Sequence, residues 1–186
     1  MCIRDSILLS IAVDRVEMKK EKKLLYYSLY ADVPRIKSYL QEKTSEQIRG
    51  IRRWDGRTPL HMVSSQLPIP PDTQQIQESI TILIQAGIAP DAMDQFGQTP
   101  LHYAIRTGNQ TAAQCLLDAG ANPNARESKY GSTPLHYAAT LGMLDLIEII
   151  VHAGGMPDTS RNDGKSPAQL LAQYHPHKSA VLNPAH

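Results

Sequence analysis

The chain has 186 residues, of which 41% are hydrophobic and 20% are charged. This composition excludes a chain that is disordered throughout and fits a domain with a buried core. The net charge of +1 hides an asymmetry, because residues 1–57 carry 13 Lys and Arg against 8 Asp and Glu, whereas residues 58–186 carry 6 against 10. Cys2 and Cys115 are too few for a disulfide framework or a zinc site, which favours a reducing compartment. We therefore expect a cytoplasmic protein, with secretion as an effector as the alternative.

The first residues are set apart from the fold. Residues 1–6 (MCIRDS) resemble the translated end of a sequencing-library adapter, and the apolar run at 7–13 is too short to span a bilayer. Met18, which opens the segment MKKEKKLL, is an alternative natural start. We therefore treat residues 1–17 as a non-native leader and expect no membrane span.

Two short motifs recur along the rest of the chain with one period. The segment Thr-Pro-Leu-His and its weaker last form, Ser-Pro-Ala-Gln, begin at Thr58, Thr99, Thr133 and Ser166, in steps of 41, 34 and 33 residues. A Gly-x-x-Pro segment recurs in phase with it, and its prolines are Pro90, Pro123 and Pro157. Two series that share a period indicate an internal repeat.

Each unit is predicted to contain two antiparallel helices and a turn. Thr or Ser before Pro is typical of a helix start, because the hydroxyl caps a free N–H and proline needs no N–H there. The first helices are expected at 99–106 and 133–140, ended by Gly108 and Gly142 in the left-handed conformation. The second helix has a wide apolar face, as in residues 144–151.

A turn and two helices at a period of 33 residues, opened by Thr-Pro-Leu-His, resemble the ankyrin repeat. The resemblance implies an all-α ankyrin-repeat solenoid of stacked helix-turn-helix units with hairpin-like turns between them. A single unit cannot bury both faces of its helices, so stability depends on contacts between neighbouring units.

The repeat pattern divides the chain into segments. After the leader we expect a degenerate N-terminal repeat (18–53), a repeat with an inserted Pro-rich loop (54–93), two regular repeats (94–126 and 127–160) and a partial C-terminal capping repeat (161–186). The inserted residues fall within 66–75, where Pro68, Pro70 and Pro71 exclude a helix. This loop is either a recognition element or a tolerated insertion.

No residue pattern indicates catalysis. His61, His102 and His136 recur at one place in each unit, and the resemblance implies that they hydrogen-bond between neighbouring turns. His175 and His177 lack further metal ligands at a known spacing. Cys115 is interpreted as a small core residue rather than a reactive thiol. Because no nucleotide loop, nucleophile elbow or zinc-protease motif occurs, we expect no catalytic residue, metal, cofactor or small-molecule substrate.

The resemblance also implies a binding surface, since ankyrin-like proteins contact partners with the turn tips and the exposed side of the first helix. The residues that match these places are Trp54, Arg57, Gln95, Phe96, Gln98, Tyr103, Arg106, Lys129, Tyr130, Tyr137, Thr140 and Leu141, with Met62, Thr107 and Ser132 beside them. Aromatic and Arg side chains dominate interface energies, and each tip carries an aromatic residue. The alternative is that these rings pack on the adjoining tip.

We therefore expect a monomeric, non-catalytic module that binds an unidentified partner protein. The alternative is an interaction fragment of a larger enzyme or secreted bacterial effector whose catalytic part lies outside this chain. Arg49, Arg52, Arg53 and Arg57 form a basic group, but no nucleic-acid fold motif accompanies it, so a solvated loop is the preferred interpretation and nucleic-acid binding is not expected.

Overall fold

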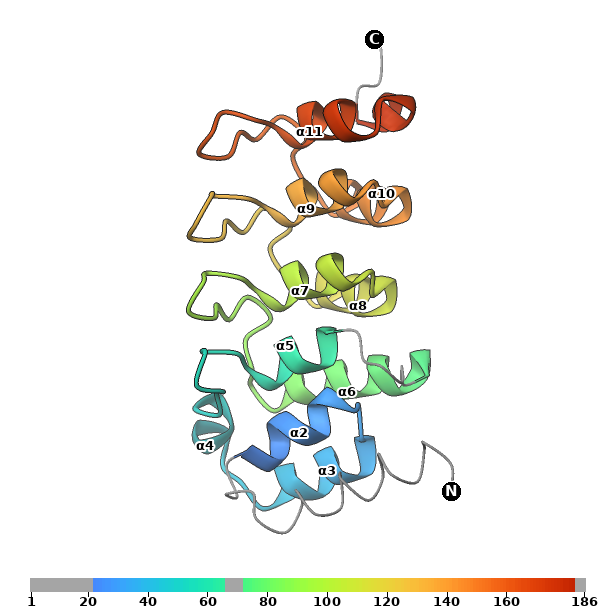
Figure 1. Cartoon of the computed structure of the whole chain (residues 1–186). Helices are drawn as coiled ribbons and strands as arrows, with labels where there is room; N and C mark the ends of the chain where they lie inside the picture. Colours follow the sequence, from blue (N-terminus) through green and yellow to red (C-terminus); the bar gives the residue numbers. More distant parts are fainter. Residues whose placement is uncertain (1–21, 66–71, 183–186) are drawn as a thin grey trace, which may run out of the picture.

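The protein forms a row of stacked helix pairs (Figure 1). This computed structural model describes residues 22–65 and 72–182, and those residues contain no strand. The expected all-α solenoid is confirmed. The predicted leader, 1–17, and most of the predicted Pro-rich loop lie outside the described residues.

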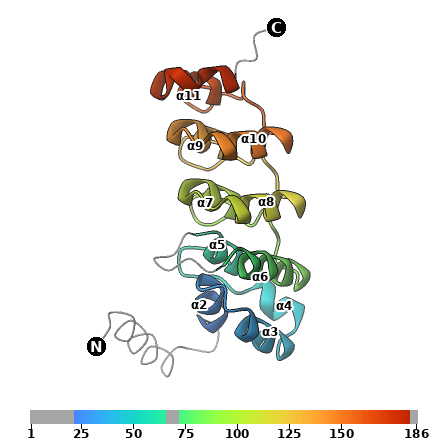
Figure 2. The same ribbon diagram turned by 90° about the vertical axis from the view of Figure 1, so that its right-hand side faces the viewer.

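The helix pairs follow one another in chain order. Their elements are α2 (Lys23–Leu29), α3 (Val33–Gln41), α4 (Ser45–Arg49), α5 (Pro59–Ser64), α6 (Thr73–Gln85), α7 (Pro100–Thr107), α8 (Gln110–Asp118), α9 (Pro134–Leu141), α10 (Leu144–His152), α11 (Pro167–Tyr174) and the 3-10 helix η2 (Pro176–Val181). Figure 2 shows the first helices α5, α7, α9 and α11 in one column and the second helices α6, α8 and α10 in another. The turns between pairs project to one side of the stack (Figure 1).

The helix ends follow the predicted chemistry with small shifts. Proline is the first residue of α5, α7, α9 and α11. The helices α7 and α9 begin and end one residue later than predicted, with Gly108 and Gly142 as left-handed C-caps at φ of 73° and 65°. The predicted hydroxyl cap is present at Ser166, whose Oγ accepts from the Gln169 N–H at 3.3 Å.

Two elements differ from the sequence analysis. The short helix α4 was not predicted, and it is held by a capping box between Thr44 and Gln47. The helix α6 begins at Thr73, inside the segment assigned to the Pro-rich loop, because the Asp72 side chain accepts from the Gln75 N–H at 2.8 Å and caps it there. Part of the insertion therefore lengthens the second helix.

The core runs along the stack between the two columns of helices. Leu60, Leu101 and Leu135, from the same place in each Thr-Pro-Leu-His motif, are fully buried. Leu116 and Ile150 complete the core from the second helices. None of the helices within 22–65 and 72–182 is both long and apolar enough to cross a membrane. The periodic apolar positions are thus used to join neighbouring units.

Candidate protein-binding surface

The turns between units share one backbone design. Each is closed by a hydrogen bond from the N–H of its first residue to a later carbonyl, as from Asp94 to Gln98 at 3.0 Å and from Glu127 to Ser132 at 3.0 Å. Gly97 adopts a φ of 72°, the left-handed conformation that this turn requires. The turn at 127–132 contains one residue more than the turn at 94–98.

Neighbouring turns are joined by backbone hydrogen bonds. The N–H of Gln95 donates to Asp55 O at 3.1 Å, and the N–H of Ser128 donates to Phe96 O at 2.9 Å. A third bond of this kind, from Asn162 to Tyr130 O, measures 2.8 Å. The turn tips are therefore held in a fixed order along the stack, which suits a preorganised binding surface.

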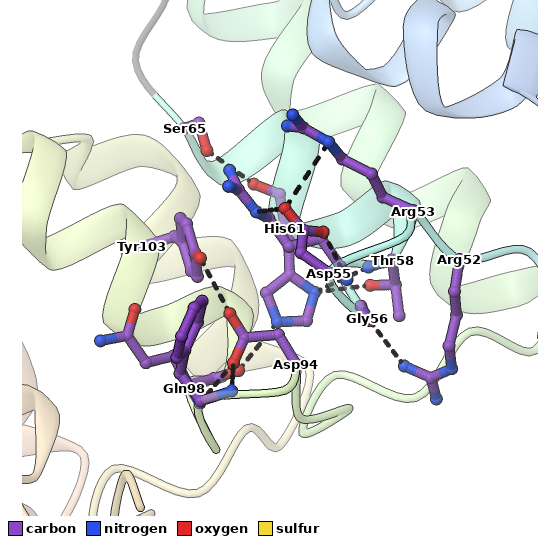
Figure 3. Close-up of polar contacts among 12 residues, drawn as sticks. Arg52, Arg53, Asp55, Gly56, Thr58, His61, Ser65, Asp94, Gln98 and Tyr103 are labelled. Carbon is purple, nitrogen blue, oxygen red and sulfur yellow. Dashed lines mark hydrogen bonds and ion pairs between the residues drawn. The ribbon is translucent and has the colours of Figure 1, made fainter. Parts of the chain in front are cut away.

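A buried carboxylate organises each of the two central turns. Asp94 accepts from the backbone N–H groups of Phe96 and Gln98 at 2.8 and 2.9 Å, and from the hydroxyl of Tyr103 at 2.8 Å. Figure 3 shows this cluster. Glu127 accepts from three backbone N–H groups of its own turn in the same way. Both carboxylates are thus occupied inside the protein.

The recurring histidines connect one unit to the next. The Nδ1 of His61 accepts from the Thr58 N–H at 3.0 Å, and its Nε2 lies 2.9 Å from Gln98 O in the following turn (Figure 3). Because Nδ1 accepts, the neutral ring carries its proton on Nε2 and donates it to that carbonyl. His102 and His136 repeat the arrangement with distances of 3.2 Å to the next unit.

Burial keeps these rings neutral. Desolvation lowers the pKa of His61 and of His102 to about 4, and it also lowers the pKa of His136. The histidines therefore bridge neighbouring units, as the resemblance implied, and their rings are uncharged near neutral pH.

A tyrosine from the following unit covers two of the three histidines. Tyr103 packs edge-to-face on His61 with ring centroids 5.3 Å apart, and Tyr137 packs on His102 at 5.8 Å. The equivalent residue of the last unit, four after Ser166, is Leu170. In the described part of the chain no aromatic ring packs in this way on His136. The surface beside α9 is correspondingly hollowed.

This hollow, called the α9 hollow below, has a volume of about 340 Å³. Its lining consists of Arg106, Tyr130, Ser132, His136, Tyr137, Thr140, Leu141 and Arg161. Five residues of the predicted binding set therefore meet at one place, although they come from two first helices and a turn. Arg161 was missed by the sequence analysis because it begins the turn of the degenerate last unit, where the tip motif is weakest.

The predicted tip aromatics are exposed, but they do not all occupy the same position within their turns. Trp54, Phe96 and Tyr130 are 80%, 52% and 49% exposed, respectively. The bonds between turns make Asp55, Phe96 and Tyr130 equivalent, so Trp54 lies one residue earlier. Phe96 and Tyr130 therefore occupy equivalent places on neighbouring turns, whereas Trp54 is offset by one residue and has the guanidinium of Arg53 over its ring, 5.6 Å from the centroid.

Four predicted surface residues are buried instead, which corrects their placement. Met62, Gln98, Tyr103 and Ser132 are 6%, 9%, 3% and 4% exposed. The guanidiniums of Arg57 and Arg106 lie over the Tyr103 ring, 5.2 and 4.8 Å from its centroid, and burial raises the pKa of the tyrosine to about 12. These side chains support the surface from beneath because each unit shields the first helix of its neighbour.

The remaining candidate sites have structural roles. Arg53 and Arg57 of the basic group lie 3.5 and 2.8 Å from the Asp55 carboxylate, and Arg52 donates to Gly56 O at 3.1 Å. Cys115 is half-buried, and desolvation raises the pKa of its thiol. Within residues 22–65 and 72–182, no group of three or more His, Cys, Asp or Glu side chains is arranged to hold a metal ion.

Stacked helix pairs with bonded turns and a hollowed first-helix face define a linear repeat protein. The model of the family "Ankyrin repeats (3 copies)" matches residues 73–163. Residues 73–163 thus form ankyrin repeats, and such repeats are in general protein–protein interaction modules.

Curated relatives share the repeats over part of their length. "Ankyrin repeat, SAM and basic leucine zipper domain-containing protein 1" of Colobus guereza and of Nomascus leucogenys are each 28% identical over 96 residues, which is 47% of this chain and 17% of theirs. The Homo sapiens protein of that name is 34% identical over 71 residues, 34% of this chain and 15% of its own. The match thus spans about a sixth of these relatives.

Proposed function

We propose that the chain is a non-catalytic binding module that recruits a partner protein through its turn tips and first helices, centred on the α9 hollow. The observation that carries the proposal is the convergence of Arg106, Tyr130, Tyr137, Thr140 and Leu141 on that hollow. Aromatic, aliphatic and Arg side chains around a depression are the usual anchors of a protein interface.

The rigidity of the surface supports the same function. Phe96 and Tyr130 stand on turns that are bonded to each other, so little conformational entropy is lost when a partner contacts both rings. Three arginines of the basic group, Arg52, Arg53 and Arg57, are engaged with Asp55 or with backbone carbonyls, which argues for a protein partner rather than nucleic acid. The proposal includes a monomeric module acting in the cytoplasm.

A displayed library of protein fragments selected on the immobilised full chain tests this function. Binders are expected to lose at least about tenfold in affinity for the double variant Phe96→Ala, Tyr130→Ala, because interface aromatics carry much of the binding energy. The matched control is Val151→Ala, Met156→Ala, which removes two exposed apolar side chains elsewhere. Both variants should keep the circular dichroism of the parent.

The proposal fails if no binder is selected, or if the binders keep their affinity for the first variant and lose it for the second. Either result moves the function away from the α9 hollow and the adjoining tips.

A second candidate follows from the short span of the match. Because the aligned region is about a sixth of the curated relatives, the module is alternatively the interaction part of a longer enzyme or effector. Genomic sequence beyond both ends distinguishes the two, since an open reading frame that continues into a catalytic domain supports the longer protein.

A further inference from the structure

The two sides of the stack differ in their free charges. On the second-helix side, Asp118, Asp145 and Glu148 line an open hollow between α8 and α10. On the turn side, Asp94 and Glu127 are buried and accept hydrogen bonds from their own turns. Asp94 and Glu127 are therefore occupied within the protein, whereas Asp118, Asp145 and Glu148 lie on the surface.

The cations around the α9 hollow are less fully neutralised. Arg161 forms a two-bond pair with Asp163, with both distances 2.7 Å. Arg106, by contrast, lies within 4 Å of no carboxylate in residues 22–65 and 72–182. Lys129 extends over the Tyr130 ring at 4.7 Å and also has no ion pair among those residues. Arg106 is therefore an unpaired cation at the edge of the hollow, and Lys129 is a second one beside Tyr130, on the turn that lines the hollow.

Arg106 is also held in position before any ligand arrives. Its guanidinium stacks on the Tyr103 ring at 4.8 Å and donates to Gln98 Oε1 at 3.0 Å. A fixed guanidinium with remaining N–H groups is suited to a carboxylate, because the planar fork matches both oxygens. An oriented Arg loses less side-chain entropy on binding than a free one.

The wall beside this cation is mainly apolar. Leu141 is 44% exposed, and it borders the hollow together with the rings of Tyr130 and Tyr137. A volume of about 340 Å³ is near the lower end for ligand pockets, and its open form suits one side chain of a peptide rather than a whole small molecule.

We infer that the α9 hollow binds an acidic peptide segment of the partner, with an apolar side chain against Leu141 and the tyrosines and an Asp or Glu side chain on Arg106. This inference rests on the proposed function and specifies the chemistry of the partner. The attraction between this side of the stack and an acidic segment also steers the encounter, so association is expected to be faster at low salt.

The test uses the full chain and a set of short peptides with acetylated N-termini and amidated C-termini, which excludes a terminal carboxylate as the ligand. Each peptide carries Leu, Phe or Tyr at a fixed central position, and Glu, Gln or Lys at one flanking position. Fluorescence anisotropy is expected to show that the best Glu peptide binds about tenfold more tightly than its Gln and Lys counterparts.

Two variants locate the interaction. Arg106→Gln should reduce the affinity for the Glu peptide to that for the Gln peptide, while it leaves the Gln peptide nearly unaffected. Leu141→Ser should weaken binding of both peptides, since it removes part of the apolar wall. The matched control is Arg35→Gln on α3, which removes the same charge in the first unit and should have no effect. Thermal unfolding verifies that each variant is folded.

Equal affinities for the Glu and Gln peptides, or a Glu preference that survives Arg106→Gln, would overturn the inference. So would tighter, Arg106-dependent binding of a single-stranded DNA oligonucleotide than of any peptide. The proposed function stands in these cases if fragment binders still depend on Phe96 and Tyr130. The proposed function is also rejected only if the fragment selection yields no binder that depends on Phe96 and Tyr130.

Discussion

The Nε2 of His102 donates its proton to the carbonyl oxygen of Ser132, 3.2 Å away in the following turn, while its Nδ1 accepts from the Thr99 N–H at 3.2 Å. One neutral imidazole thus caps its own helix and joins two repeats. The arrangement depends on the ring remaining neutral, because protonation of Nδ1 would replace an acceptor with a donor.

Stability should therefore depend on pH below neutrality. The folded-state pKa of His61 and of His102 is about 4, below the unfolded value near 6.5, so the unfolded chain binds more protons between these limits. The free energy of unfolding should fall by about 2 kcal/mol per histidine from pH 7 to pH 5. Urea unfolding at the two pH values measures it.

A matched variant assigns this pH dependence to the bridges. His61→Gln removes one of the two buried imidazoles while it keeps a side chain that can cap the helix, and it should reduce the pH dependence. A free energy of unfolding that is constant between pH 7 and pH 5 would contradict a neutral bridging role for His61 and His102.

Each bridging histidine has two roles, to cap its own helix and to bond to the next unit, and different substitutions should separate them. In the last unit Gln169 Oε1 accepts from the Ser166 N–H at 2.9 Å, so Gln can supply the cap that His136 supplies in the preceding unit. We expect His136→Gln to retain the cap and lose the bridge to Lys165, and His136→Ala to lose both. Each lost buried bond costs about 1–3 kcal/mol, so the Ala variant should unfold at lower urea concentration. Equal midpoints for the two variants would contradict this division.

The close approach of neighbouring turns predicts that alanine substitutions at two glycines will destabilise the protein to different extents. Both Gly97 and Gly120 have a positive φ, 72° and 84°, so alanine at either costs about 1 kcal/mol in backbone strain. A Cβ at Gly97 would lie 2.8 Å from the backbone N of Ser128, whereas one at Gly120 would have no atom within 4 Å. Gly97→Ala should therefore lower the free energy of unfolding by roughly 1–3 kcal/mol more than Gly120→Ala. Thermal unfolding of the pair checks the difference, and equal losses would count against a close approach of the two turns.

Two leucines separate stability from binding. Leu101 is fully buried between units, and Leu141 is exposed beside the α9 hollow. Leu101→Ala should cost about 2–5 kcal/mol in unfolding free energy, whereas Leu141→Ala should cost less than about 0.5 kcal/mol. Affinity for a selected partner should fall with Leu141→Ala at a temperature where both variants are folded. A large loss of stability with Leu141→Ala would place this side chain in the core.

Local chemistry in the sequence accounts for most of the fold. Thr-Pro segments, left-handed glycines and the apolar period set the helix starts, ends and buried faces, because these features act within a few residues. The start of α6 was misplaced because Asp72 and Thr73 extend the helix toward the prolines, and the sequence gives no sign of how far the loop reaches.

The candidate binding surface was less predictable from the sequence because it depends on distances between units. The extra residue in the turn at 127–132 changes which tip positions are equivalent, and that register is fixed only by bonds such as Asn162 to Tyr130. The burial of Tyr103 and the hollow beside His136 both depend on what the neighbouring unit places opposite them. The sequence shows Leu170 where the preceding units have a tyrosine, but it does not show that this change leaves His136 without a covering ring.

The bonds between units run in both directions along the stack, since His102 donates forward to Ser132 and the Ser128 N–H donates back to Phe96. The donors and acceptors on one face of an interior unit therefore match those on its opposite face, as well as those of the units that now lie beside it. A tandem duplication of residues 94–126 would meet matching donors and acceptors on either side, so evolution or protein engineering can lengthen this surface without devising a new interface.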